Sequence, residues 1–264
     1  MIIKKDNYKE KLSKLTKDNF NIVTDFDRTI TSSDSIATWG IINNRGILPN
    51  EYDFERNSLY NYYRPIELDP NLDEAVKMGA MEDWLNKHLD LFKKYELSKD
   101  NIIDVFSVED MMTFRKGFLD FFKYVDDLNI PFNILSAGIG DFLLKFLEIN
   151  NCSFVNIDVR SNFLKFDRKD IVIGFKGPII NSLNKQMFAY EKEDQDYVIL
   201  LGDQVSDIMM VKGYPRENII AIAFVPDDNM QEMESFKDVF DVVLTNDEGF
   251  DEILKDLKSV LDNK

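Results

Sequence analysis

Short apolar runs recur along the chain, and each ends in a polar or glycine-containing segment. Five of them have the continuous apolar character of strands buried on both faces. These runs are Asn21–Thr24, Phe132–Leu135, Tyr197–Leu201, Ile219–Val225 and Val242–Thr245. Because helical stretches separate them, the pattern predicts an α/β protein with a mainly parallel sheet that is covered by helices on both faces.

Weaker patterns predict further elements. Helical spacing at 8–17 indicates a short surface helix, and similar signals lie at 117–122 and near 184–191. Two short β-like segments are predicted around 155–159 and 171–175.

The region from about 35 to 113 differs from the rest of the chain, because it has no convincing strand pattern. Helical periodicity is clear from Met81 to Phe92, and Pro49, Pro65 and Pro70 are expected to interrupt the helices. A segment of this length is better explained as a small helical module than as a loop.

We therefore expect two domains. Residues 1–33 and 114–264 are predicted to form the α/β core, and residues 34–113 are predicted to form a helical domain inserted into it.

Composition narrows the range of functions. The 264 residues carry a formal net charge of −16, which argues against a polynucleotide partner, since such proteins need clustered Lys and Arg. The single cysteine, Cys152, cannot form an internal disulfide and is expected in the core. The chain shows no signal-peptide pattern at its start and no apolar run of transmembrane length. We expect a cytoplasmic protein without a membrane partner.

Polar side chains follow three of the apolar runs. Asp25 and Asp27 follow the first run, Ser136 follows the second, and Asp203 and Asp207 follow the third. In open parallel sheets, ligands bind beyond the carboxyl ends of the strands, so these side chains are predicted to converge. Four carboxylates placed together would repel one another, and Mg²⁺ suits a site that carboxylates, water and a substrate phosphate complete.

This arrangement suits phosphate chemistry. One aspartate could act as a covalent nucleophile, and its neighbour two residues on could protonate the leaving oxygen and later deprotonate water. The Ser136 hydroxyl and the backbone amides of the turn after it could hold the phosphoryl oxygens, while a lysine would neutralise the charge that builds up.

The motifs resemble those of a known superfamily. Asp25-Phe26-Asp27-Arg28-Thr29, Ser136-Ala137-Gly138, a later lysine and Gly202-Asp203-Gln204-Val205-Ser206-Asp207 are similar to the four motifs of the haloacid dehalogenase-like (HAD-like) hydrolases. Segments around them, including Gly174-Phe175-Lys176-Gly177, resemble the cytosolic pyrimidine 5′-nucleotidases of type III. The resemblance implies a Rossmann-like, doubly wound sheet as a HAD-like core, with an inserted helical cap.

The resemblance also assigns roles by position. It implies that Asp25 is the nucleophile and Asp27 the general acid and base. Asp203 would bind Mg²⁺ together with Asp25 and the backbone carbonyl of Asp27, and Asp207 would support the metal.

Phosphate binding and the lysine follow from the same resemblance. Ser136 and Ala137 would hold phosphate. Lys185 would be the catalytic lysine, because Asn184-Lys185 fits the family's position better than the competing Lys176.

In the cap, the family reads the nucleobase with an acidic residue before a tryptophan. Asp83, before Trp84, stands in that place as a predicted substrate contact, although it could equally be a solvated helix residue. His88 could be either a surface residue or a substrate contact, and the sequence leaves both alternatives open. Trp39 and the aromatic cluster Tyr60, Tyr62 and Tyr63 are expected mainly in the cap's own core.

The resulting expectation is a Mg²⁺-dependent phosphohydrolase for nucleoside 5′-monophosphates, pyrimidine nucleotides first, with an aspartyl-phosphate intermediate. One alternative is a phosphatase for another small phosphomonoester, such as a sugar or amino-acid phosphate. Another is a binding protein without turnover. A monomer is favoured, but the sequence does not determine the oligomeric state.

Overall fold

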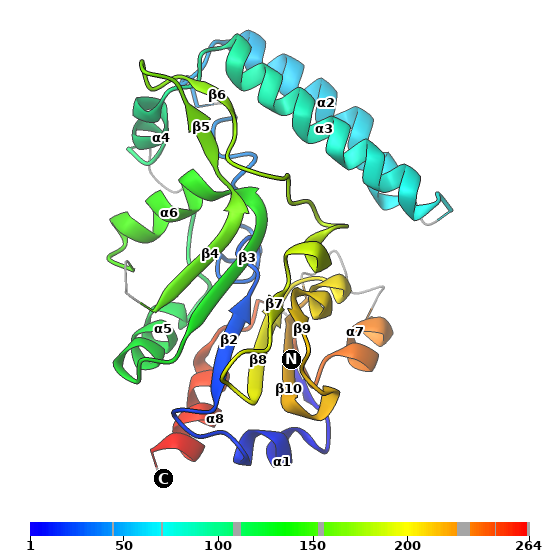
Figure 1. The fold of residues 1–264 in the computed structure, drawn as a ribbon, viewed down its shortest axis with the longest axis vertical. Coiled ribbons are helices and arrows are strands. Elements are labelled where there is room, and N and C mark those ends of the chain that lie inside the picture. The colour runs from blue at the N-terminus through cyan, green and yellow to red at the C-terminus, as the bar shows by residue number, and fades with distance from the viewer. Residues whose placement is uncertain are drawn as a thin grey trace.

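A seven-stranded sheet forms the centre of the computed structural model, which describes residues 1–43, 45–69, 71–107, 112–152, 156–225, 233–245 and 247–262 (Figure 1). The strand order is β1-β11-β10-β8-β2-β3-β4, and all neighbours are parallel except the edge strand β1. The strands are β1 (Ile2–Lys4), β2 (Phe20–Thr24), β3 (Phe132–Ile139), β4 (Ile157–Asn162), β8 (Tyr197–Gly202), β10 (Ile219–Phe224) and β11 (Val242–Leu244).

The winding of the sheet reverses next to β2. From β2 the chain builds outward through β3 and β4, and it then returns to the other side of β2 to add β8, β10 and β11. This doubly wound arrangement confirms the predicted fold class. The reversal leaves the carboxyl ends of β2 and β8 side by side, which is where open α/β sheets bind ligands.

Both faces of the sheet are buried, as the continuous apolar runs predicted. Helices α1 (Tyr8–Ser13), α5 (Phe118–Asp127), α6 (Gly140–Ile149) and α8 (Asp251–Leu261) contribute to one core cluster, and α7 (Met233–Val239) contributes to the other. Side chains of one strand alternate between the two clusters, since Ile22 belongs to the first and Val23 to the second.

The predicted helical region contains α2 (Asn50–Leu68), α3 (Glu74–Lys94) and α4 (Lys99–Val105). Helices α2 and α3 lie side by side as a long pair, away from the sheet (Figure 1). Pro49 precedes α2, but Pro65 lies inside it, so the expected interruption there is wrong. Pro65 falls near the end of α2, and the helix continues past it without the one hydrogen bond that a proline nitrogen cannot donate. Pro70 lies outside the described residues.

The segment predicted at 171–175 does not join the parallel sheet. It forms β6 (Val172–Phe175), which pairs antiparallel with β5 (Leu164–Phe166) in a separate two-stranded sheet. The hairpin lies against the helical region, where Val172 N donates to Leu97 O at 2.9 Å. Residue 155 of the other β-like segment lies outside the described residues. The division at residues 34 and 114 stays a prediction.

The helix expected near 184–191 is wrong. The chain forms a single 3₁₀ turn, η1 (Lys185–Phe188), and then the short strand β7 (Tyr190–Glu191), which pairs with β9 (Val211–Lys212). Two further 3₁₀ segments are η2 (Val205–Met210) and η3 (Arg216–Asn218). Side-chain amides of Asn181 and Asn184 bond to nearby backbone groups, and such local bonds compete with helix formation.

The predicted surface helix at 8–17 is shorter and more buried than expected. Helix α1 ends at Ser13, and its Lys11 is 5% exposed because Nζ pairs with Asp241 at 3.0 Å. Cys152 is buried, as expected, and burial raises the pKa of its thiol to about 11. None of the helices in the described part of the chain is long and apolar enough to cross a membrane.

Candidate active site

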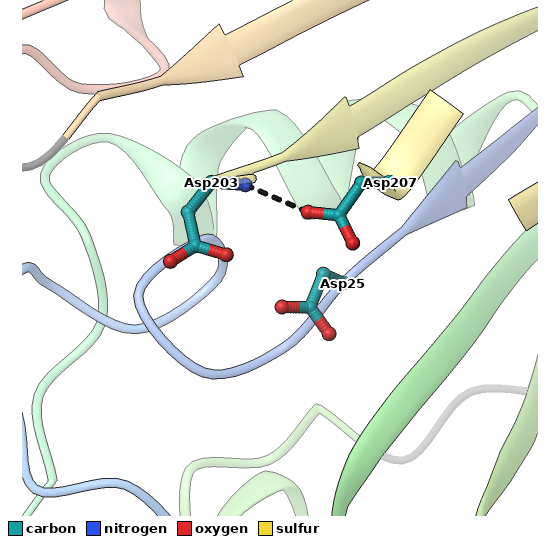
Figure 2. A group of neighbouring side chains, drawn as sticks. All are labelled: Asp25, Asp203 and Asp207. Carbon is teal, nitrogen blue, oxygen red and sulfur yellow. Dashed lines mark hydrogen bonds between the residues drawn. The ribbon is translucent and has the colours of Figure 1, made fainter. Parts of the chain in front are cut away.

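Three buried aspartates meet at the carboxyl ends of β2 and β8 (Figure 2). Asp25 directly follows β2, Asp203 directly follows β8, and Asp207 lies on η2. Thr24 and Leu201 are partners in the parallel ladder, and Asp25 N donates to Leu201 O at 3.0 Å, which fixes the two strand ends in register. One carboxylate oxygen from each aspartate lies within 4.8 Å of the others. The fold thus brings together three of the four carboxylates that were predicted to converge.

Lys185 is the cation of this cluster. Its Nζ lies 2.8 Å from Asp25 Oδ1 and 2.9 Å from Asp207 Oδ1, and the residue is 6% exposed. Burial alone would lower the pKa of Lys185, but the two carboxylates outweigh it and raise that pKa. The competing Lys176 is exposed, and it is not among the residues that line the cavity above this cluster.

The charges of the cluster are unbalanced. Three carboxylates face the Lys185 ammonium, and the charge of Arg28 acts on Asp203 as well. Burial, and next the neighbouring carboxylates, nevertheless raise the pKa of Asp25 and of Asp203. Among the described residues, no group donates a hydrogen bond to the Asp203 carboxylate. A closely spaced, buried and under-compensated set of oxygen donors suits a hard divalent cation such as Mg²⁺.

Asp207 is held from two sides. Its Oδ2 accepts hydrogen bonds from the backbone N–H groups of Asp203 and Gln204, both at 3.0 Å, and its Oδ1 accepts from Lys185. Gly202 permits this contact, since a Cβ there would lie 2.5 Å from the Asp207 side chain. The geometry makes Asp207 an anchor that fixes Lys185 and the loop carrying Asp203.

Asp27 lies within the tight turn that follows β2, in which Phe26 O accepts from the N–H groups of residues 29, 30 and 31. Its carboxylate lies outside the three-aspartate cluster and accepts hydrogen bonds from Thr38. Burial, and next the charge of Asp25, raise the pKa of Asp27 to about 7. A carboxyl group with such a pKa can both give and take a proton near neutrality.

Ser136, Ala137 and Gly138 lie within β3 rather than after it, because the strand continues to Ile139. The register against β4 shifts between Leu135 and Ile139, so these three residues form a bulge. The Ser136 hydroxyl accepts from Gly138 N at 3.0 Å, and Ala137 O accepts from Trp39 Nε1 at 2.8 Å. The predicted phosphate-holding residues therefore lie beside the aspartates on a distorted strand.

A cavity of about 290 Å³ opens above these groups. We call the strand-end and loop residues of the α/β core that line this cavity its floor. Its wall consists of residues from α2, α3 and the segment before them. The floor includes Asp25, Asp27, Ser136, Ala137, Lys185, Asp203 and Asp207, and the wall includes Trp39, Tyr60, Arg64, Glu67, Met81 and Trp84.

Two residues predicted from the cap are placed elsewhere. Asp83 does not line the cavity, because its carboxylate accepts from the Tyr63 hydroxyl and pairs with Lys87 at 2.9 Å. His88 is neither at the surface nor in the cavity lining; it is 1% exposed and packs against Trp39 and Phe92. The surface alternative for His88 is therefore wrong, and the substrate contact stays a prediction.

Several cavity residues were not predicted. Arg64 and Glu67 form a pair at 2.6 Å on α2, and Glu67 Oε1 accepts from the Ser182 hydroxyl at 3.0 Å, across the cavity. Thr38, which does not itself line the cavity, was also not predicted and donates two hydrogen bonds to the carboxylate of Asp27. An Arg and a Glu three residues apart on a helix are indistinguishable in sequence from an exposed ion pair, so no signal identified them.

Comparison with known proteins assigns the family. Residues 7–261 match the family described as pyrimidine 5′-nucleotidase (UMPH-1). The chain belongs to this family.

Relatives in this family are similar along most of their length. The human 7-methylguanosine phosphate-specific 5′-nucleotidase is 32% identical over 257 residues, which cover 92% of this chain and 85% of the relative. A Xenopus laevis protein named 7-methylguanosine phosphate-specific 5′-nucleotidase A is 33% identical, with 89% and 85% covered. With its family and these relatives, the chain is a phosphoric monoester hydrolase of the 5′-nucleotidase type.

Solved structures agree with the fold. Cytosolic 5′-nucleotidase IIIB bound to cytidine has a TM-score of 0.87 and 28% identity, covering 99% of this chain and 94% of that one. A phospho-aspartyl intermediate analogue of phosphoserine phosphatase has a TM-score of 0.56 at 17% identity, covering 90% and 97%. The second likeness shows the fold alone, and together they confirm the HAD-like core.

Proposed function

We propose that this 5′-nucleotidase hydrolyses nucleoside 5′-monophosphates with Mg²⁺ and an aspartyl-phosphate intermediate. One observation carries the proposal: Asp25, Lys185, Asp203 and Asp207 meet at the floor of a cavity whose wall presents Trp39, Tyr60 and Trp84. The floor suits a phosphate and the wall suits a flat base.

The phosphate would enter between Asp25 and the bulge of β3. The Ser136 hydroxyl, whose oxygen accepts from Gly138 N, keeps its hydrogen for a phosphoryl oxygen, and the backbone N–H of Ala137 would donate to another. Lys185 can neutralise the charge that develops on these oxygens. Asp25, Asp203 and the backbone carbonyl of Asp27 would hold Mg²⁺, while Asp207 keeps Lys185 and the Asp203 loop in place. When bound, Mg²⁺ would neutralise phosphoryl charge and orient the phosphate toward Asp25.

The reaction takes two steps. A carboxylate oxygen of Asp25 bonds to phosphorus while the bond from phosphorus to the 5′-oxygen breaks, and that oxygen takes the proton of Asp27. Asp27 then takes a proton from a water molecule as the water oxygen bonds to phosphorus and the bond to Asp25 breaks. The pKa of Asp27, about 7, suits both transfers.

The aromatic wall would receive the base. Stacking on an aromatic ring is worth about 1–3 kcal/mol per base and is open to any base. Arg64 and Glu67, at the edge of the wall, provide a donor and an acceptor for the base edge.

Two kinds of base have specific support. Pyrimidines are expected from the sequence, and cytidine is bound in the similar cytosolic 5′-nucleotidase IIIB. The names of the relatives point to 7-methylguanosine phosphate, whose positively charged ring would gain from aromatic faces and from Glu67. We place the activity in the cytoplasm, and a relative named putative cytosolic 5′-nucleotidase 3 supports this.

A phosphate-release panel tests the proposal. It contains UMP, CMP, GMP, 7-methyl-GMP, a sugar phosphate and phosphoserine, each with Mg²⁺ and with EDTA. We expect release from nucleotides that EDTA abolishes, with the fastest nucleotide identifying the base. Preference for the sugar phosphate or phosphoserine would favour the alternative substrates, and no release from any compound would leave only a binding protein.

A further inference from the structure

We propose that Thr38 is a positioning residue for the proton-transferring Asp27, and that the segment leading into α2 therefore sets the geometry of proton transfer. The proposal rests on the function proposed above. Thr38 carries no motif and was not predicted as part of the site. It lies in a turn eleven residues after Asp27 and is 1% exposed.

Both oxygens of the Asp27 carboxylate are bound by this one residue. Thr38 N–H donates to Oδ1 at 3.1 Å, and the Thr38 hydroxyl donates to Oδ2 at 3.0 Å. Among the described residues, no other group donates a hydrogen bond to this carboxylate, since Lys185 is committed to Asp25 and Asp207. Rotation of the Asp27 side chain would thus break both bonds.

The direction of the hydroxyl bond is fixed by a third contact. Ile139 N–H donates to Thr38 Oγ1 at 3.1 Å, so the oxygen accepts from β3 and keeps its single hydrogen for Asp27. A hydroxyl free to rotate could have served as either donor or acceptor. Here the backbone of β3 orients it, and the bulge that bears Ser136 is thereby linked to Asp27.

Gly138 leaves the space that this contact needs. A Cβ at Gly138 would lie 2.1 Å from Thr38 Oγ1 and 3.0 Å from Asp27 Oδ2. Next to Thr38, the Trp39 indole donates to Ala137 O at 2.8 Å and ties the same turn to the bulge a second time. The segment before α2 is therefore fixed to the floor at the point where the proton is transferred.

The expected consequence concerns the leaving group. A nucleoside 5′-oxygen is a poor leaving group and needs a proton, whereas the phenolate of 2,4-dinitrophenyl phosphate leaves without one. A misplaced Asp27 should slow phosphorylation of Asp25 by the first substrate and not by the second. Loss of folding, of metal binding or of phosphate binding would slow both.

The test compares Thr38→Val with Thr38→Ser. Valine keeps the volume and the backbone bond to Oδ1 but removes the hydroxyl, and serine keeps the hydroxyl. Single-turnover nucleoside release is measured with the fastest nucleotide of the panel, and the pre-steady-state burst is measured with 2,4-dinitrophenyl phosphate. We expect Thr38→Val to release nucleoside about 10- to 100-fold more slowly, less than the roughly 10²- to 10⁴-fold that a general acid contributes, because Asp27 is displaced and not removed. Its burst rate should stay within about 2-fold of wild type. Thr38→Ser should restore nucleoside release.

The matched control is Thr245→Val, which also removes a buried threonine hydroxyl, but one that donates to Met1 O and not to Asp27. It should match wild type with both substrates. Should Thr38→Val not fold, Thr38→Ala removes the same hydroxyl, and its burst amplitude counts the competent sites.

Three results would overturn the proposal. The first is that Thr38→Val, or Thr38→Ala in its place, slows both substrates equally. The second is that this variant reacts with both substrates at wild-type rates. The third is that Thr38→Ser does not restore nucleoside release. A wild-type protein that releases neither product overturns the proposed function itself. The rates of the wild-type protein therefore distinguish a failure of the proposed function from a failure of the proposal that Thr38 positions Asp27.

Discussion

The floor and the wall of the cavity are built in different ways. Floor residues stand at strand ends whose positions are fixed by the parallel ladder, and backbone groups hold them, as in the two amide bonds to Asp207. Most wall residues project from α2 and α3 and contact other side chains, as in the Arg64–Glu67 pair, whereas Trp39, before α2, donates to the backbone carbonyl of Ala137. The difference implies that the chemistry belongs to the sheet and that substrate choice belongs to the helices.

The largest effect is expected on the floor. Asp25→Asn removes the proposed nucleophile and should reduce turnover by about 10⁴-fold or more, while substrate binding through Lys185 and Ser136 is expected to persist. Phosphate release gives the rate, and calorimetric titration gives the binding. Asp120→Asn, an exposed carboxylate on α5, is the control and should leave both unchanged. Near-wild-type turnover in Asp25→Asn would exclude the covalent route.

The next effect tests whether His88 is part of the packing behind the wall. Burial lowers the pKa of His88 to about 3, so the folded protein keeps it neutral, whereas the unfolded chain protonates it below about 6.5. The unfolded state binds more protons between these values, so stability falls as the pH drops through this window.

When the pH falls from 7 to 5, the free energy of unfolding should therefore decrease by about 2 kcal/mol because of His88. Urea unfolding at both pH values measures this, with His88→Gln as the comparison. Between pH 7 and pH 5, the decrease in the free energy of unfolding should be smaller in the glutamine variant than in wild type by about that amount. An identical pH response in both proteins would contradict the assignment, and an altered KM at pH 7 would return His88 to the substrate site.

Trp84→Ala tests the wall directly. Removing one stacking surface should raise KM for the preferred nucleotide about 10-fold and change KM for p-nitrophenyl phosphate by less than about 2-fold. Trp84→Phe keeps an aromatic face and should lie close to wild type. Equal increases with both substrates would place Trp84 in phosphate binding or folding, and the separation of floor from wall would fail.

The smallest effect is expected for Asp83. Its partners are Tyr63 and Lys87, and it is absent from the cavity lining, so Asp83→Ala should leave KM for nucleotides within about 2-fold. Steady-state kinetics with a nucleotide and with p-nitrophenyl phosphate provide the measurement. A rise confined to the nucleotide would support the base-reading role predicted from the resemblance.

The floor was largely predictable from sequence. A buried parallel strand is a continuous apolar run, and the first polar residue after it marks the edge where ligands bind, which located Asp25 and Asp203. The bulge at Ser136 was missed, because the apolar run stops before it although the ladder resumes at Ile139. Lys185 was located by resemblance, since a single 3₁₀ turn leaves no periodic signal.

The wall was not predictable to the same degree. Helical periodicity shows which face of α3 is apolar, but it does not show which exposed residues face a cavity formed by another part of the chain. Asp83 and Trp84 are adjacent in sequence, yet only Trp84 lines the cavity. Thr38 was invisible for a different reason, since its role depends on a hydrogen bond to Ile139, 101 residues away.

The burial of Cys152 has a practical consequence for optical and magnetic spectroscopy. It is the only cysteine of the chain, it is 3% exposed, and its raised pKa keeps the thiol protonated and unreactive at neutral pH. A cysteine introduced at an exposed site, such as Tyr62 on α2, would take a maleimide dye or a nitroxide selectively. A second cysteine in place of the exposed Lys116, just before α5, would provide the partner label. The distance between α2 and the α/β core can then be followed during turnover in an otherwise unaltered chain.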